Sequence, residues 1–437
     1  MEPLRIKDNS RIEKAEFLNI PALTARIADK TLGQLEKDGI FVFPERLRKA
    51  EDLTEDQMLL SSADDCYRTS NIVGFLGCGE ERLVIASRFS QKNQDYFFQY
   101  LLERVMKVPH FTAFETDVNQ DNRIFNLLVF LFPHYLRSAM RKGIFKTYVR
   151  RNYNDGHVRG TIQIARHIAE NTPFLGKIAY TQREYSADND LTQLIRHTIE
   201  AIKSKCYGAQ ILAKVKDQVR EIVNATQRYE PCDRARIMAA NKKNPAGHAY
   251  YREYRALQHL CLLILQHQLH QLGTGSRQVY GVLFDAAWLW EEYINLLLSD
   301  RFYHPMNKGG KDGQYLFDRS RGLIYPDFLS RDAAERTVAD AKYKPVEHIG
   351  NRDYLQVLAY MLRFDARRGL YLYPESGDTD QLLLQVNSGS SYENNVAPRS
   401  DLSVVKCGLH IPQNAKSYLQ FKHEIGMEEK QFCCKIN

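Results

Sequence analysis

The chain has 437 residues, enough for two to four domains at roughly 100–200 residues per domain. Charged residues make up 26% and hydrophobic residues 44%, which excludes collagen-like, mucin-like and wholly disordered classes. Lys and Arg total 60 against 53 Asp and Glu, a net charge of +7. That balance is compatible with nucleic-acid binding and equally with an ordinary globular protein of slightly positive charge.

No feature of the sequence indicates export or membrane insertion. The eight cysteines form no CxxC pair, so we expect reduced thiols in a cytoplasmic chain. The N-terminus is charged and lacks the apolar core of a signal peptide. The most hydrophobic short run, 127–132, has six residues, whereas a membrane-spanning helix needs about 20. We therefore predict no membrane partner.

Residues 1–115 are predicted to form a β-rich N-terminal domain. A strand is expected at 39–43, and two more at 71–76 and 82–86 flank the turn Gly77-Cys78-Gly79, which predicts a hairpin. Apolar residues within 95–106 recur at helical spacing, which predicts one helix there.

Residues 116–277 are predicted to form a mainly helical middle domain. Helices are expected at 124–140, 191–201, 210–226 and 255–272. The stretch 137–166 is strongly basic and has tyrosines interleaved. Such a strip suits a phosphate backbone, a solvated face or an acidic protein partner. Its basic residues are Arg137, Arg141, Lys142, Lys146, Arg150, Arg151, Arg159 and Arg166.

Residues 278–437 are predicted to form a third domain with a mixed sheet. A helix is expected at 282–298, strands at 314–317, 322–328 and 336–344, and a second helix at 353–364. Further strands are expected at 369–373, 381–386 and 402–409, whereas the last dozen residues look frayed. This order is typical of an α+β or α/β fold. The whole chain is thus predicted to be mixed α+β.

The most informative pattern is Pro326-Asp327 followed by Asp340-Ala341-Lys342. Positions 340 and 342 of a strand point to the same face, and Asp327 is expected to end the preceding strand. If the two strands pair as a hairpin, both carboxylates and the Lys342 ammonium meet at one edge.

These residue types suit phosphodiester hydrolysis. The reaction needs a divalent ion to offset charge on the phosphate and to activate water. Mg²⁺, with Mn²⁺ as an alternative, prefers oxygen ligands; Asp327, Asp340 and the backbone carbonyl of Ala341 supply three. Lys342 is placed to orient the water or stabilise the phosphate. Glu291, or its neighbour Glu292, is the candidate for a third acid.

The helix that follows carries Gln356 and Tyr360 one turn apart, so the two side chains share a face. They are candidates to support the site. The alternative interpretation is a surface hairpin with an Asp–Lys pair and a helix packed by Tyr360.

Taken together, Asp327, Asp340-Ala341-Lys342, Gln356 and Tyr360 resemble the PD-(D/E)xK nuclease core, and more narrowly the McrC family. Four upstream blocks extend the resemblance, which covers residues from about 70 to 405. The blocks are Arg141-Lys142-Gly143-Ile144 with Tyr148, Val158-Arg159-Gly160-Thr161-Ile162, Ser186-x-Asp188-Asn189, and Tyr250-Tyr251.

The resemblance implies the metal-dependent nuclease subunit of a modification-dependent restriction system, acting on double-stranded DNA. It implies a partner, an McrB-like AAA+ GTPase ring that the subunit stimulates and that recognises modified cytosine in the best-known systems. It places Asp327, Asp340 and Lys342 in the site, with Glu291 less firmly placed. The N-terminal region is assigned to partner contact on resemblance alone.

This chain has no G-x-x-x-x-G-K-[ST] loop, so we expect it to bind no nucleotide itself. Two alternatives stay open: a catalytically silent activator of an AAA+ ring, and a repair nuclease with the same core that acts alone.

Overall fold

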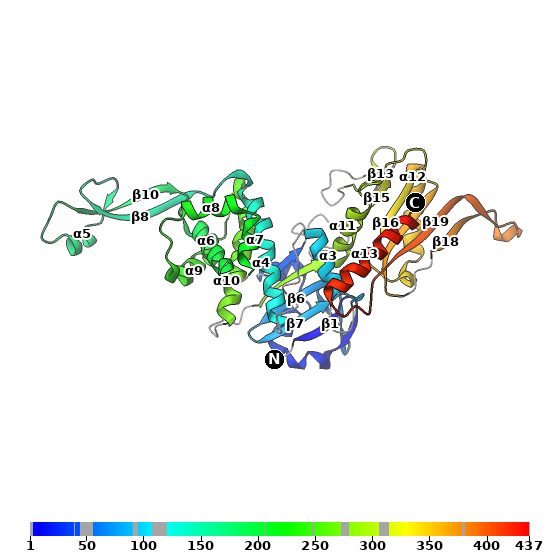
Figure 1. Ribbon diagram of the computed structural model, residues 1–437, viewed down its shortest axis with the longest axis horizontal. Helices are drawn as coiled ribbons and strands as arrows, with labels where there is room; N and C mark the ends of the chain where they lie inside the picture. Colours follow the sequence, from blue (N-terminus) through cyan, green and yellow to red (C-terminus); the bar gives the residue numbers. More distant parts are fainter. Residues whose placement is uncertain are drawn as a thin grey trace. The chain divides into compact units, whose positions relative to one another are not determined.

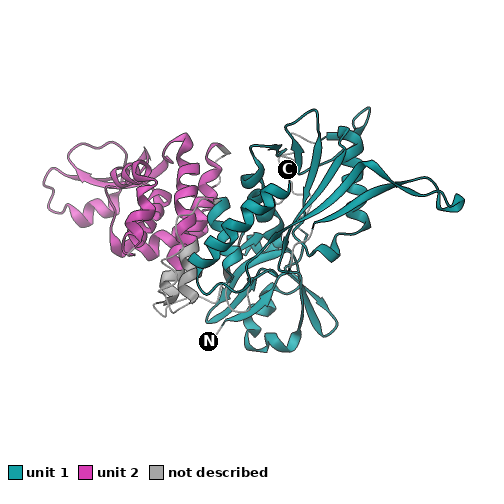
Figure 2. Ribbon diagram, turned by 45° about the vertical axis from the view of Figure 1, so that its right-hand side comes forward, with its two compact units in different colours: residues 1–118, 277–437 teal, residues 119–276 magenta. Residues whose placement is uncertain are grey.

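The computed structural model describes residues 3–38, 40–43, 56–90, 95–106, 120–205, 207–246, 249–271, 279–305, 314–377 and 381–436. The chain forms two compact units, shown in Figure 2: unit 1 comprises 1–118 and 277–437, and unit 2 comprises 119–276. The predicted domain boundaries at 115 and 278 lie outside the described residues.

The N-terminal part of unit 1 is built on a five-stranded sheet of order β1-β7-β6-β11-β3, with a three-stranded sheet of order β2-β5-β4 beside it. The hairpin predicted around Gly79 is confirmed, since β6 and β7 pair antiparallel. Helices α1, α2 and α3 complete this part. The elements are β1 (Leu4–Lys7), β2 (Arg11–Glu13), α1 (Pro21–Ile27), α2 (Leu32–Lys37), β3 (Phe41–Phe43), β4 (Leu60–Ala63), β5 (Cys66–Thr69), β6 (Ile72–Cys78), β7 (Glu81–Ala86) and α3 (Tyr96–Met106).

The helix predicted from residue 282 is wrong over its first four positions. Residues 282–285 belong to strand β11 (Val279–Asp285), which pairs with β6 and β3 in the N-terminal sheet. The helix, α11 (Ala286–Leu298), begins only after Asp285, whose side chain accepts a hydrogen bond from Ala287 N at 2.9 Å. Apolar helical spacing cannot reveal where a buried strand gives way to a helix. The third predicted region therefore starts inside the first sheet.

The C-terminal part of unit 1 is built on a six-stranded mixed sheet of order β12-β15-β16-β17-β19-β18. Strands β16, β17 and β19 run parallel, and the outer pairs are antiparallel. Helix α12 packs on one face through an apolar core that includes Val338, Val357 and Met361. The elements are β12 (Phe302–Tyr303), β13 (Gln314–Phe317), β14 (Arg321–Ile324), β15 (Phe328–Ser330), β16 (Thr337–Ala341), α12 (Asn351–Phe364), β17 (Arg368–Glu375), β18 (Leu382–Ser388) and β19 (Ala397–His410).

Two predictions for this part need correction. The strand predicted at 322–328 is two strands: β14 pairs with β13, and β15 pairs with β16. Pro326 lies between them and has no N–H to donate to a ladder, so Asp327 precedes β15 rather than ending a strand. The C-terminus is not frayed but forms α13 (Tyr418–Lys435), which buries Tyr418, Phe421 and Phe432.

Unit 2 contains the predicted helices and, in addition, a long β arm. Strands β8 and β10 pair antiparallel over nine residues each and extend away from the helices, with α5 near the far end (Figure 1). The helix predicted at 210–226 is split, because Val215 leaves helical backbone angles. The elements are α4 (Gln120–Ala139), β8 (Thr147–Asp155), β9 (Thr161–Ile162), α5 (Ile164–Glu170), β10 (Ile178–Ser186), α6 (Asp190–Lys203), α7 (Gly208–Ala213), α8 (Lys216–Ala225), α9 (Arg234–Lys243) and α10 (Glu253–Gln271).

Candidate functional site

The two predicted aspartates face each other at the end of β15 and β16. Phe328 pairs with Ala339, so the next position of this antiparallel register sets Asp327 opposite Asp340. The Asp327 carboxylate accepts a hydrogen bond from Ala341 N at 2.9 Å. Asp340 is only 1% exposed. The strand pairing predicted from the sequence thus brings both carboxylates to one edge.

Lys342 joins this edge from the end of β16. Its Nζ lies 2.7 Å from Asp340 Oδ2 and donates to Gln356 Oε1 at 3.2 Å. Burial alone would lower the pKa of the Lys342 ammonium, but the negative charges of Asp340 and Asp327 outweigh it and hold this pKa above its usual value. Lys342 is therefore a cation at any physiological pH.

Helix α12 supplies a chain of hydrogen bonds behind Lys342. Gln356 Nε2 donates to Tyr360 Oη at 2.7 Å, and Tyr360 Oη donates to the carbonyl oxygen of Tyr325 at 3.0 Å. Because the Gln356 amide is fixed by Tyr360, its oxygen is held toward the lysine. The alternative interpretation is met in part, because the Asp–Lys pair is present and Tyr360 packs in the core. The hairpin is not a surface one, however, since Asp340 is buried and Lys342 is four-fifths covered.

The electrostatics of the cluster favour a cation. Burial raises the pKa of Asp327 well above its usual range, and the nearby charges of Glu291 and Asp340 raise it further, against the opposing effect of Lys342. The charged form of Asp327 is therefore disfavoured in the site without an ion, and a cation bound beside it would favour that form.

His304 also belongs to this cluster, although sequence reasoning did not select it. Its Nδ1–H donates to the carbonyl oxygen of Asp327 at 2.8 Å, and its Nε2 lies 3.6 Å from Glu291 and 3.9 Å from Glu292. Burial would lower the pKa of His304, but the two glutamates and the Asp327 carbonyl raise it above its ordinary value overall. An isolated histidine after a short strand gives no sequence signal, so only the structure identifies it.

The donors present suit a hard divalent ion bound largely through water. Across the described ranges, no three His, Cys, Asp or Glu side chains form a ready-made metal cage. Mg²⁺, however, commonly uses one or two carboxylates and keeps several waters, which fits Asp327 and Asp340. Glu291 reaches the cluster through its charge on Asp327 and its proximity to His304.

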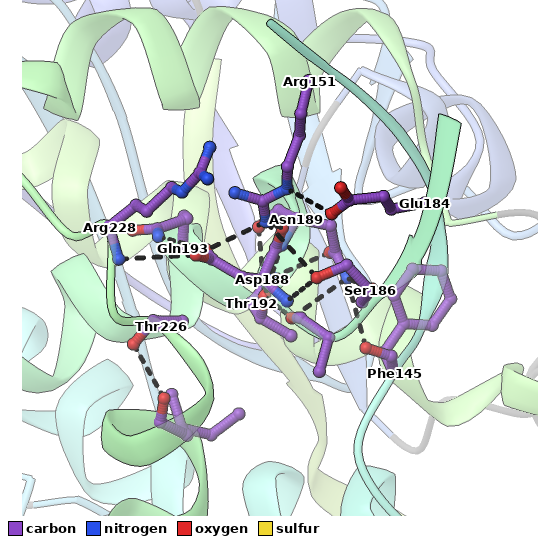
Figure 3. A network of polar contacts seen from close by, with 12 residues as sticks. Phe145, Arg151, Glu184, Ser186, Asp188, Asn189, Thr192, Gln193, Thr226 and Arg228 are labelled. Carbon is purple, nitrogen blue, oxygen red and sulfur yellow. Dashed lines mark hydrogen bonds and ion pairs between the residues drawn. The ribbon is translucent and has the colours of Figure 1, made fainter. Parts of the chain in front are cut away.

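A second polar network lies in unit 2, where β10 meets α6 (Figure 3). It is built by the Ser186-x-Asp188-Asn189 block. Asn189 caps α6 by accepting from Leu191 N and Thr192 N, and its amide donates to the carbonyl oxygens of residues 145, 186 and 187. This side chain ties the start of β8, the end of β10 and α6 together.

Asp188 continues the same network toward β8 and the loop after α8. Gln193 Nε2 donates to Asp188 Oδ1 at 2.5 Å, and Arg228 N donates to Oδ2 at 3.4 Å. Arg151 Nη2 lies 3.5 Å from Asp188 Oδ2 and donates to its backbone oxygen at 2.8 Å; Arg151 Nε lies 3.5 Å from Glu184. The Ser186-x-Asp188-Asn189 block therefore anchors the β arm to the helices of unit 2.

Comparison with known proteins identifies the family of this chain. The family described as "McrBC 5-methylcytosine restriction system component" matches residues 67–374, well over half of the chain. The chain belongs to this family. The resemblance to the McrC family that the sequence motifs indicate is thereby confirmed. A search of curated proteins finds no match.

Two solved structures are similar. The "Refined half-complex from tetradecameric assembly of Thermococcus gammatolerans McrB AAA+ hexamers with bound McrC" contains a chain with 15% identity and a TM-score of 0.50, covering 98% of this chain and 100% of that one. A chain in the "Cryo-EM structure of the Thermococcus gammatolerans McrBC complex" has 16% identity and a TM-score of 0.33, covering 68% and 87%. The first likeness shows a shared fold.

The base of the arm in this McrBC family member borders a cleft of about 930 Å³. Two residues of the basic strip predicted at 137–166, Arg150 and Arg151, follow each other on β8 and so point to opposite faces of the arm. Arg151 faces inward and is offset by Glu184 and Asp188, whereas Arg150 is exposed and pairs in register with Arg183 on β10. The strip is therefore part internal ion pairs and part exposed charge.

Among the described helices, none is long and apolar enough to cross a membrane.

Proposed function

We propose that this chain is the nuclease subunit of an McrBC-type restriction system and cuts DNA by metal-dependent phosphodiester hydrolysis. The observation that carries the proposal is the meeting of Asp327, Asp340 and Lys342 at the edge of a mixed sheet. A PD-(D/E)xK core accounts for this combination of sheet, acids and lysine.

In this proposal Asp327, Asp340 and the Ala341 carbonyl hold the divalent ion, with Glu291 as a further acid. When bound, the ion offsets charge on the phosphate and makes a bound water more acidic. Lys342 then stabilises negative charge on the phosphate or orients the attacking water. Gln356 and Tyr360 keep the Lys342 ammonium in place.

The family and the fold shared with a chain of an McrB–McrC assembly support a partner, an AAA+ GTPase ring that this chain stimulates. We propose the far end of the β arm as a surface for that contact, in addition to the N-terminal region that the resemblance assigns to it. Large apolar side chains are exposed there, and such patches mark protein interfaces. They are Val158, Ile162, Ile164, Ile168, Phe174 and Leu175.

The test is cleavage of methylated double-stranded DNA by the purified chain with its cognate ring, GTP and Mg²⁺. We expect Asp340→Ala and the isosteric Asp340→Asn to reduce cleavage to background while both retain ring binding and GTPase stimulation. Asp401→Ala, which removes an exposed carboxylate from β19 of the same sheet, is the matched control and should cut normally.

Three results would redirect the proposal. Normal cleavage by Asp340→Asn contradicts the site. Stimulation of the GTPase by a parent chain that never cuts identifies the silent activator. Cleavage without ring or nucleotide identifies a nuclease that acts alone.

A further inference from the structure

Tyr371, in the centre of β17, carries a polar atom that the fold leaves unused. Its side chain is fully buried, with 0% exposure. Its hydroxyl has no hydrogen-bond partner among the described residues. A buried hydroxyl without a partner destabilises the fold, and a phenylalanine of the same shape would avoid this cost.

The hydroxyl lies beside the acidic site. Tyr371 is in register with Asp340 on the parallel neighbouring strand, so both side chains leave the sheet on the same face. Its ring packs edge-on against Tyr354 of α12, with centroids 6.1 Å apart. Burial raises the pKa of Tyr371, and the charges of Asp340 and then Asp353 raise it further.

Two of the polar groups that act on this hydroxyl, Asp353 and Tyr360, hydrogen-bond elsewhere. The Asp353 carboxylate accepts from Lys344 Nζ at 2.7 Å and from Gly350 N at 3.0 Å. Tyr360 Oη is bonded to Gln356 and to the Tyr325 carbonyl. Asp340 is the charged group that acts most strongly on Tyr371, and its Oδ2 lies 2.7 Å from Lys342 Nζ.

We propose that Tyr371 is a positioning residue of the nuclease site, whose hydroxyl donates a hydrogen bond to the Asp340 carboxylate when a divalent ion binds there. The inference rests on the proposed function, because it takes Asp340 as an ion ligand. Donors behind a ligating carboxylate fix its orientation, and their removal typically weakens metal binding by about 10–100-fold.

The test is Tyr371→Phe in the full chain, with Mn²⁺ binding followed by titration calorimetry and by electron paramagnetic resonance. We expect Mn²⁺ affinity to fall about tenfold. The unfolding temperature of the metal-free chain should stay unchanged or rise, because the substitution removes a hydroxyl without a partner. Tyr373→Phe is the matched control, since Tyr373 is also buried on β17 but lies near Glu375 and Cys407; it should bind Mn²⁺ normally.

Unchanged Mn²⁺ affinity in Tyr371→Phe, with weakened binding in Asp340→Asn, overturns the role of Tyr371 and leaves the proposed nuclease site intact. A lower unfolding temperature in Tyr371→Phe together with weaker binding identifies a packing role and also overturns it. Normal Mn²⁺ binding in Asp340→Asn overturns the site itself, and the inference with it.

Discussion

Replacing Asp188 by alanine tests whether the network at the base of the β arm holds unit 2 together. The substitution removes the acceptor of the short bond from Gln193 Nε2 (2.5 Å) and the ion-pair partner of Arg151 (3.5 Å). A hydrogen bond to a charged group contributes roughly 1.5–3 kcal/mol, and a long, partly screened ion pair about 0.5–1 kcal/mol. We expect the free energy of unfolding to fall by about 2–4 kcal/mol.

The assay is urea unfolding of the full chain, followed by far-UV circular dichroism and by tryptophan fluorescence. Trp288 and Trp290, the only two tryptophans, both lie in α11 of unit 1, so fluorescence reports on unit 1 alone. We expect the circular dichroism transition, to which the helices of unit 2 contribute, to move to lower urea. The fluorescence transition should move less.

Asp190→Ala is the control for charge removal at the same helix end. Asp190 has an exposed side chain, 3.6 Å from Arg236, so its removal should cost at most about 1 kcal/mol. If Asp188→Ala unfolds within about 0.5 kcal/mol of the control, the network does not stabilise unit 2 as we reason.

Two further substitutions test other parts of the fold. Burial and then the charge of Arg234 lower the pKa of His197 from 6.5 to about 4. The folded state therefore favours the neutral imidazole. The stability that this gives is complete above pH 6.5 and is lost as the pH falls toward 4. Within this window the unfolding free energy changes by up to about 1.4 kcal/mol per pH unit. His197→Leu should therefore reduce the slope of the unfolding free energy against pH between pH 4 and 6.5, measured by urea titrations. An unchanged slope contradicts this reasoning. Glu429 of α13 accepts hydrogen bonds from the hydroxyls of Tyr100 and Tyr293, each at 2.7 Å. Glu429→Ala should therefore destabilise unit 1 by about 2–4 kcal/mol, measured by tryptophan fluorescence in urea. An unshifted midpoint would show that these two hydrogen bonds do not stabilise unit 1.

The carboxylate and lysine positions were predictable because strand alternation is local. A two-residue period placed Asp340 and Lys342 on one face, and the hairpin with Asp327 followed from short spacing. His304 was not predictable, because its role depends on contacts with Asp327 and Glu291 from two other segments. The same holds for Tyr371, whose neighbour on the adjacent strand is set by a parallel pairing that the sequence does not encode locally.

Long-range pairing also explains the errors in the fold. Residues 282–285 of β11 were predicted to be helical because their apolar residues continue into α11. Only the pairing of β11 with β6 and β3 shows that they form a strand. The β arm was missed because its exposed, charged faces lack a simple apolar alternation. Helix α13 has charged residues between its buried aromatics, and its packing against α3 and α11 reveals it.

The insertion of unit 2 into unit 1 has a consequence for folding during synthesis. Strand β3 pairs with β11 at the end of the five-stranded sheet, and the ribosome makes all of residues 119–276 between them. At roughly 5–20 residues per second, that interval is on the order of 10–30 s. During this interval β6 exposes the strand edge that β11 later covers. An exposed strand edge can pair with another chain and so promote aggregation until β11 has been synthesised and pairs with β6.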